Sequence, residues 1–116
     1  MSWHDIIEER SFELHQVIAE ILRNDPSGLE VALAWIERML SDPEYSIHSK
    51  AALMEWRDVI QSRGLEGVLA VLSDREESAR RMRHASPFAL LMPQEKRLEI
   101  FSRYEARRPR ARSAGI

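Results

Sequence analysis

Apolar side chains recur every three or four positions over the first 24 residues of the chain. The stripe comprises Trp3, Ile7, Leu14, Val17, Ile18, Ile21 and Leu22. This period places apolar residues on one face of an α-helix. Ser2 can serve as the N-cap because Asp5 follows three residues later, as in a capping box. The pattern therefore predicts an amphipathic helix that ends at about Asn24.

Two further stripes follow, each after an Asp-Pro pair. Pro26 is expected at the first position of the second helix, with Asp25 as its cap. The third helix is predicted to begin near Ser46 or Ser49 and to end before Gly64, where glycine adopts a positive φ at little cost. The apolar residues of these two helices are Leu29, Ala32, Leu33, Ile36, Met39 and Leu40, then Ala52, Leu53, Trp56, Val59 and Ile60.

The remaining elements are shorter. Residues 65–72 are apolar enough for a strand, but every neighbouring segment is helical, so we predict a short buried helix. Ser73 and Glu76 have the spacing of a capping box that opens a largely solvated helix. Pro87 ends that helix, and Pro93 opens the last one. One face of the last helix is expected to carry Leu98, Phe101 and Tyr104.

These elements predict an all-α fold, a small bundle of four to five helices with a basic, partly disordered C-terminal arm beyond Glu105. The 116 residues are enough for one domain, and 44% of them are hydrophobic, which is ordinary for a globular protein. The predicted core comprises Ile7, Leu14, Ile18, Ile21, Leu33, Ile36, Leu40, Leu53, Trp56, Ile60, Leu69 and Leu72.

Charge divides the chain into two parts. Residues 1–77 carry seven basic and sixteen acidic side chains, a net charge of −9, whereas residues 78–116 carry ten basic and three acidic ones, a net charge of +7. We interpret residues 1–84 as an acidic helical body. Residues 85–116 then supply an apolar hinge, the final helix and a basic arm that is not an independent domain.

The hinge contains the apolar run 85–92, and we expect it to bind a partner. Our hypothesis is that Phe88, Leu90, Leu91 and Met92 are only partly buried by the chain itself and are covered by a partner, because large exposed apolar patches mark binding sites. In the alternative, the run folds back over the acidic body as part of the core. The predicted partner-binding residues are Arg80, Arg81, Arg83, Pro87, Phe88, Leu90, Leu91, Met92, Arg97, Phe101, Arg103 and Tyr104.

Little in the sequence indicates catalysis. There is no Gly-rich phosphate loop, nucleophile elbow or HExxH motif, and we expect neither a cofactor nor a metal. His4, Glu8 and His15 could share one helix face, which we interpret as solvated. The chain has no cysteine, no signal-peptide pattern and no apolar run of membrane length, so we expect a cytoplasmic protein without a membrane partner.

Residues 81–100 read RMRHASPFALLMPQEKRLEI. This run resembles the end of a group of small helical bacterial proteins, some of which are antitoxins of toxin–antitoxin pairs. The opening Ile7–Ser11, with Leu14 and His15, is also similar. The chain departs from the group at Leu98, where an aromatic residue is usual. The resemblance implies a protein partner, a cognate toxin.

Two functions are consistent with these features. The first is a non-enzymatic interaction protein, an antitoxin that neutralises a toxin through its C-terminal segment 87–104. The second is a nucleic-acid-binding regulator that uses the arginine-rich arm. In this case the helical body would serve for dimerisation, and the protein could form a homodimer. The salt dependence of binding distinguishes the two functions. Phosphate binding weakens steeply with ionic strength, whereas binding through an apolar protein interface should not.

Overall fold

The computed structural model describes residues 2–109, which form five α-helices and one short 3-10 helix. The elements are α1 (Trp3–Asn24), α2 (Gly28–Leu40), α3 (Ile47–Ser73), α4 (Glu77–His84), η1 (Ala89–Leu91) and α5 (Gln94–Glu105). No strand occurs in the part of the chain that is described, which confirms the all-α prediction. The disorder expected of the arm concerns mainly residues 110–116, which lie outside that part.

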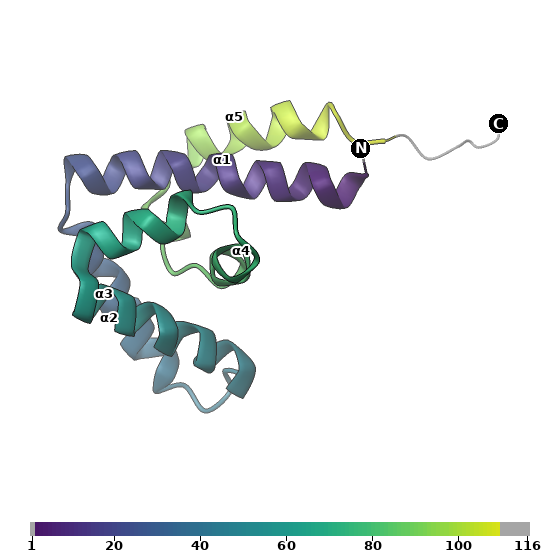
Figure 1. Cartoon of the computed structure of the whole chain (residues 1–116). Helices are drawn as coiled ribbons and strands as arrows, with labels where there is room; N and C mark the ends of the chain where they lie inside the picture. Colours follow the sequence, from purple (N-terminus) through teal and green to yellow (C-terminus); the bar gives the residue numbers. More distant parts are fainter. Residues whose placement is uncertain (1, 110–116) are drawn as a thin grey trace.

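The helices form two connected groups (Figure 1). Helix α5 lies beside α1, while α2 and the first part of α3 form a hairpin on the other side of the molecule. Helix α3 bends at Gly64, which has φ +63°, so its last part returns to α1. The positive φ expected at Gly64 is confirmed, and the helical prediction for 65–72 is also confirmed, as the continuation of α3 beyond the bend.

The main core lies between α1, α2 and the two parts of α3. Its centre is Trp56, which is fully buried and whose indole Nε1 donates a hydrogen bond to the carbonyl oxygen of Met82, 2.8 Å away. A second, smaller core between α1 and α5 contains Ile6, Ile100 and Tyr104. Of the predicted core, the buried residues are Ile18, Ile36, Leu53, Trp56, Ile60 and Leu72. The half-buried ones are Ile7, Leu14, Ile21, Leu33, Leu40 and Leu69.

Helix starts follow the predictions in two places. Ser2 caps α1, with its hydroxyl accepting from the Asp5 amide at 3.2 Å. Ser46 caps α3, with its hydroxyl accepting from the Ser49 amide at 3.1 Å. In both, a short hydroxyl side chain satisfies a backbone donor that the first turn leaves free.

Two other helix starts were predicted wrongly. Helix α2 begins at Gly28 rather than Pro26, because Asp25 accepts from the amide and hydroxyl of Ser27 and forms a turn before the helix. Ser73 is the last residue of α3 and not the cap of α4, whose N-cap Glu76 makes no side-chain capping bond. Short polar side chains support turns as readily as caps, and the sequence does not separate the two.

Candidate partner-binding surface

The apolar run after α4 folds back into the core. Phe88 has no exposed surface, and its ring meets that of Trp56 edge-to-face, with centroids 5.2 Å apart and an interplanar angle of 86°. Pro87 beside it is also buried. The hypothesis that Phe88 is only partly buried and is covered by a partner is therefore wrong. For Pro87 and Phe88 the alternative holds, because these two residues close the chain's own core. The edge-to-face arrangement of Trp56 and Phe88 is one that aromatic pairs prefer.

The rest of the run lies nearer the surface. Leu91 and Met92 are half-buried against the main core, and Leu91 lies next to the start of α2 at Gly28. Leu90 remains 46% exposed. One side of the η1 segment thus completes the fold while the other side stays exposed.

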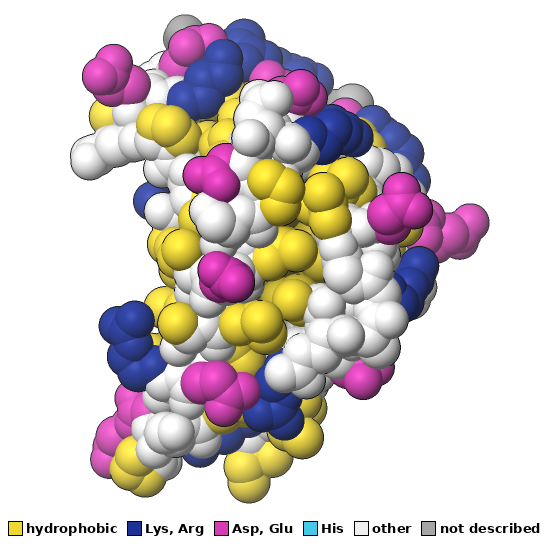
Figure 2. All heavy atoms as spheres, turned by 90° about the vertical axis from the view of Figure 1, so that its left-hand side faces the viewer, with side chains coloured by type: hydrophobic (Ala, Val, Ile, Leu, Met, Phe, Trp, Pro, Cys, Tyr) yellow, Lys and Arg dark blue, Asp and Glu magenta, His cyan; other side chains and the backbone are white. Residues whose placement is uncertain are grey.

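A groove separates η1 from α5, with a volume of about 400 Å³. The η1–α5 groove is lined by Ala89, Leu90, Met92, Gln94, Arg97, Leu98 and Phe101. Leu98 is 54% exposed there, whereas Ile100 and Tyr104 are buried. Of the predicted face of α5, Tyr104 therefore lies in the core and Leu98 on the open side, and Ile100 also belongs to the core. Figure 2 shows apolar side chains gathered along the middle of one face of the molecule, with charged groups around them.

Glu13 of α1 anchors the end of α5. Its two carboxylate oxygens accept from the Arg103 guanidinium at 3.0 and 2.7 Å, and one also accepts from the Tyr104 hydroxyl at 2.7 Å. The Arg103 hydrogen bonds lower the pKa of the Glu13 carboxyl below its ordinary value. Burial, followed by the bond to Glu13, raises the pKa of the Tyr104 hydroxyl. Two of the predicted partner-binding residues therefore hold α5 on α1.

The arginines of α4 are also engaged within the chain. Arg83 is buried and donates to the carbonyl oxygens of Val71, at 3.0 Å, and Asp74. Arg81 pairs with Glu55 of α3 at 3.3 Å, and Arg80 pairs with Glu77 at 3.6 Å. Of the five arginines expected to surround the apolar run, only Arg97 lines the groove.

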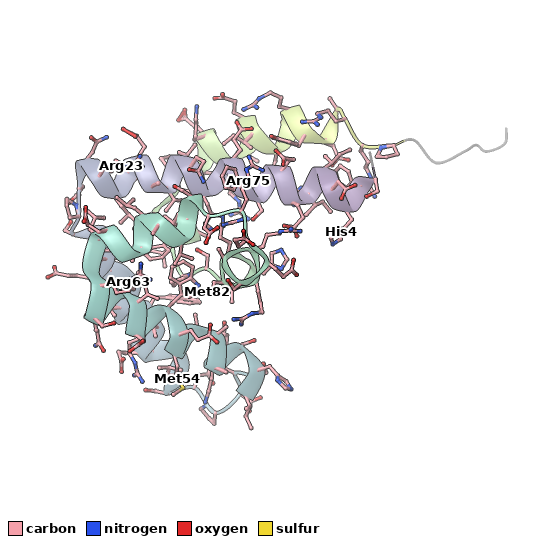
Figure 3. The ribbon with its side chains drawn as sticks, viewed as in Figure 1. His4, Arg23, Met54, Arg63, Arg75 and Met82 are labelled. Carbon is pink, nitrogen blue, oxygen red and sulfur yellow. The ribbon has the colours of Figure 1, made fainter. Side chains whose placement is uncertain are left out.

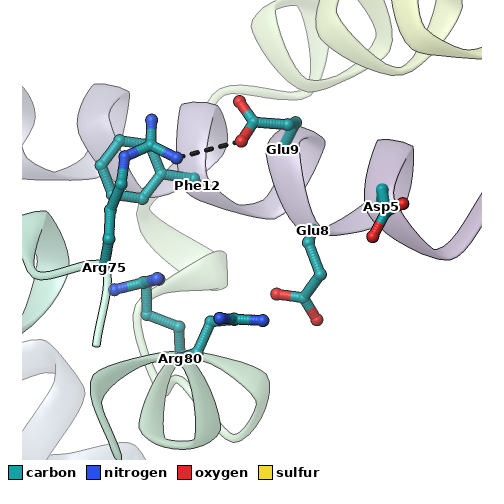
Figure 4. Close-up of a pocket in the computed structure, with 7 residues that line it drawn as sticks. Asp5, Glu8, Glu9, Phe12, Arg75 and Arg80 are labelled. Atoms are coloured by element: carbon teal, nitrogen blue, oxygen red, sulfur yellow. Dashed lines mark hydrogen bonds and ion pairs between the residues drawn. The ribbon is translucent and has the colours of Figure 1, made fainter. Parts of the chain in front are cut away.

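A second hollow, of about 240 Å³, lies between α1, α4 and the α3–α4 loop (Figure 4). Arg75 crosses it, pairing with Glu9 at 3.0 Å, with its guanidinium 3.8 Å from the ring centroid of Phe12. The α1–α4 cleft is lined by three acidic and three basic residues together with one ring, namely Asp5, Glu8, Glu9, Arg75, Arg80, Arg83 and Phe12. Its opposite charges balance in number, so it has no net charge to attract a ligand.

The histidines do not form a metal site. His4 projects from the first turn of α1 (Figure 3), whereas His15 is buried and bonds through Nδ1 to the Ser11 carbonyl oxygen at 2.7 Å. The solvated position expected of His15 was therefore wrong. Burial lowers the pKa of the His15 imidazole, and the nearby Arg83 and His84 add to this. Within residues 2–109, no three potential ligands lie close enough to hold a metal ion.

Arg10, which was not among the predicted partner-binding residues, lies beside the groove. Its guanidinium carbon is 4.3 Å from the ring centroid of Phe101, and that of Arg97 is 5.3 Å from the same centroid. The Arg10 Nε is buried and has no hydrogen-bond partner among the described residues. Arg10 comes three residues after Ile7, at the edge of the apolar stripe of the first helix. This spacing was the feature of the sequence from which its position could have been predicted.

The described residues form a small all-helical protein whose η1–α5 groove is lined by apolar side chains together with Gln94 and Arg97. Comparisons with protein-family models, with curated proteins and with solved structures gave no match to the chain. None of the described helices combines the length and apolar character needed to cross a membrane.

Proposed function

We propose that this protein is a non-enzymatic interaction protein that binds a protein partner through the η1–α5 groove. The observation that carries the proposal is the pair Leu90 and Leu98, which stand 46% and 54% exposed on a hollow of about 400 Å³. Apolar side chains that border a concave surface provide the desolvated centre typical of protein interfaces.

The partner we propose is a cognate toxin, which makes this chain an antitoxin of the bacterial cytoplasm. The support is the resemblance of residues 81–100 to antitoxins, because that run contains most of the groove, from Ala89 to Leu98. In this arrangement Phe88 acts indirectly. It packs η1 against Trp56 and so fixes the position of Leu90, which a partner would contact.

The nucleic-acid alternative concerns the arginine-rich arm beyond Glu105, of which residues 110–116 lie outside the described part of the chain. The described arginines before that arm give it weaker support. Arg81 and Arg103 pair with the carboxylates of Glu55 and Glu13, so phosphate binding would first have to displace these pairs. Extended phosphate binding also needs several cations along one track. Within residues 2–109, the groove offers a single guanidinium among mostly apolar side chains.

The test is coexpression of the full chain with the product of the neighbouring reading frame, followed by affinity measurement at low and high salt. Leu98→Asp should weaken the complex at least about tenfold by placing a charge in the apolar groove. Ile47→Asp is the matched control, because Ile47 is 82% exposed at the start of α3 and away from the groove. Absence of a complex, or equal loss with both variants, would refute the proposal.

A further inference from the structure

The η1–α5 groove has an unbalanced charge. Among the described residues, Arg97 is the only charged one that lines it, and no carboxylate of that part of the chain does. In the α1–α4 cleft, by contrast, three arginines line the hollow together with three acidic residues. The groove is therefore complementary to a ligand that combines apolar surface with negative charge.

Two guanidinium groups near the groove have no acidic partner among the described residues. Neither Arg10 nor Arg97 forms an ion pair within residues 2–109, although most of the other arginines described there do. Both guanidinium groups lie over the Phe101 ring, Arg10 from α1 and Arg97 from α5. Phe101 thus holds two positive charges beside the apolar lining, and the Arg10 Nε retains an unused, buried donor.

We infer that the η1–α5 groove receives an acidic peptide segment of the partner protein, with apolar anchors against Leu90 and Leu98 and a carboxylate paired with Arg97. Arg10 contributes a second positive charge behind the Phe101 ring. The inference rests on the proposed function and specifies the chemistry of the partner. Arginine suits this role because its planar guanidinium binds a carboxylate through two parallel hydrogen bonds.

The geometry favours a peptide over a nucleic acid. The groove has an apolar lining formed by Leu90, Met92 and Leu98. Such a lining removes water from a phosphate but offers no hydrogen bonds in return, so the free energy of desolvation is not recovered. A peptide supplies apolar side chains for this lining and needs only one acidic residue for Arg97. The size of the hollow, about 400 Å³, accommodates a few side chains rather than a folded domain.

The experiment is selection of a random peptide library displayed on phage against the full chain, with counter-selection against the Leu98→Asp variant. We expect enriched peptides to carry an acidic residue beside apolar ones. A synthetic consensus peptide is then measured against Arg97→Gln and Lys96→Gln. These substitutions each remove one positive charge from neighbouring positions of α5, but Lys96 does not line the groove.

Arg97→Gln should weaken the acidic peptide at least about tenfold, and Lys96→Gln should change its affinity by less than about twofold. Arg97→Glu should restore binding to a consensus peptide whose acidic residue is replaced by lysine. Arg10→Gln should have a smaller effect than Arg97→Gln. Circular dichroism of each variant checks that the fold is retained.

Several outcomes would overturn the inference. Enriched peptides that are neutral or basic would exclude carboxylate recognition, and so would an equal loss of peptide affinity with Arg97→Gln and Lys96→Gln. If only Leu98→Asp weakens binding, this inference fails but the proposed function still holds. If no peptide is enriched, the groove is not a peptide site. Self-association that Leu98→Asp abolishes would make a second copy of this chain the occupant. Salt-sensitive binding of single-stranded DNA, lost in Arg97→Gln, would favour nucleic acid.

Discussion

Replacement of Phe88 by alanine should destabilise the isolated protein severely. Phe88 is fully buried, and its ring packs edge-to-face on Trp56 with centroids 5.2 Å apart. Truncation removes the apolar contacts of the ring and leaves a cavity, which together cost about 3–5 kcal/mol for a buried phenylalanine. The lost aromatic geometry accounts for about 0.5–1.5 kcal/mol of that amount.

Such a loss is a large part of the total stability, since domains of this size unfold at a cost of about 5–15 kcal/mol. Leu53→Ala should lie close to it, at about 2–5 kcal/mol, because Leu53 is buried in the same core. Leu90→Ala, two residues from Phe88 but 46% exposed, should cost less than about 1 kcal/mol. Phe88 and Leu53 are both buried, whereas Phe88 and Leu90 both belong to the apolar run. The three free energies of unfolding therefore show whether burial or position in the run decides the loss of stability.

Urea unfolding followed by far-ultraviolet circular dichroism measures all three free energies. Comparison of the denaturant slopes checks that the variants still unfold in one cooperative step. A loss below about 1 kcal/mol for Phe88→Ala, with Leu53→Ala at its expected value, would refute the burial of Phe88. The run would then be a surface segment, available as an anchor for a partner.

Three further predictions concern single residues. Gly64→Ala should cost about 1–3 kcal/mol in urea unfolding, because φ +63° strains any side chain even though no atom lies within 4 Å of the added carbon. Burial lowers the pKa of His15, so the unfolded chain binds its proton first, and stability should fall as pH drops below about 6.5. His15→Gln should flatten this dependence. The pKa of Glu13 is lowered by Arg103, so its contribution is present above about pH 4.5 and is lost as pH falls through the lower folded value. Glu13→Gln should remove that acid sensitivity and cost about 1 kcal/mol at neutral pH.

The positions of the helices could be read from the sequence because they depend on local patterns. The apolar period of three to four residues and the caps Ser2 and Ser46 predict α1 and α3. Gly64 could be identified as a bend because only glycine readily adopts its conformation. The all-α class followed from the same regularities. The predicted starts of α2 and α4 were wrong because Asp25 and Ser73 suit turns and helix ends as well as caps.

The candidate site depended on contacts between distant parts of the chain. Nothing near Phe88 in the sequence indicates that its ring packs against the buried ring of Trp56. Likewise, the position of Glu13 on α1 decides that Arg103 and Tyr104 are used for packing α5.

The sequence by itself determined which segments are helical, that an acidic body is followed by a basic end, and that an additional apolar run, 85–92, must be covered by something. Only the tertiary structure decided which apolar residues close the core and which stay open. It buried Phe88 and Ile100 and left Leu90 and Leu98 exposed. The physical reason is that burial depends on which surfaces meet when the helices pack, and a local pattern specifies a helix face but not its neighbour.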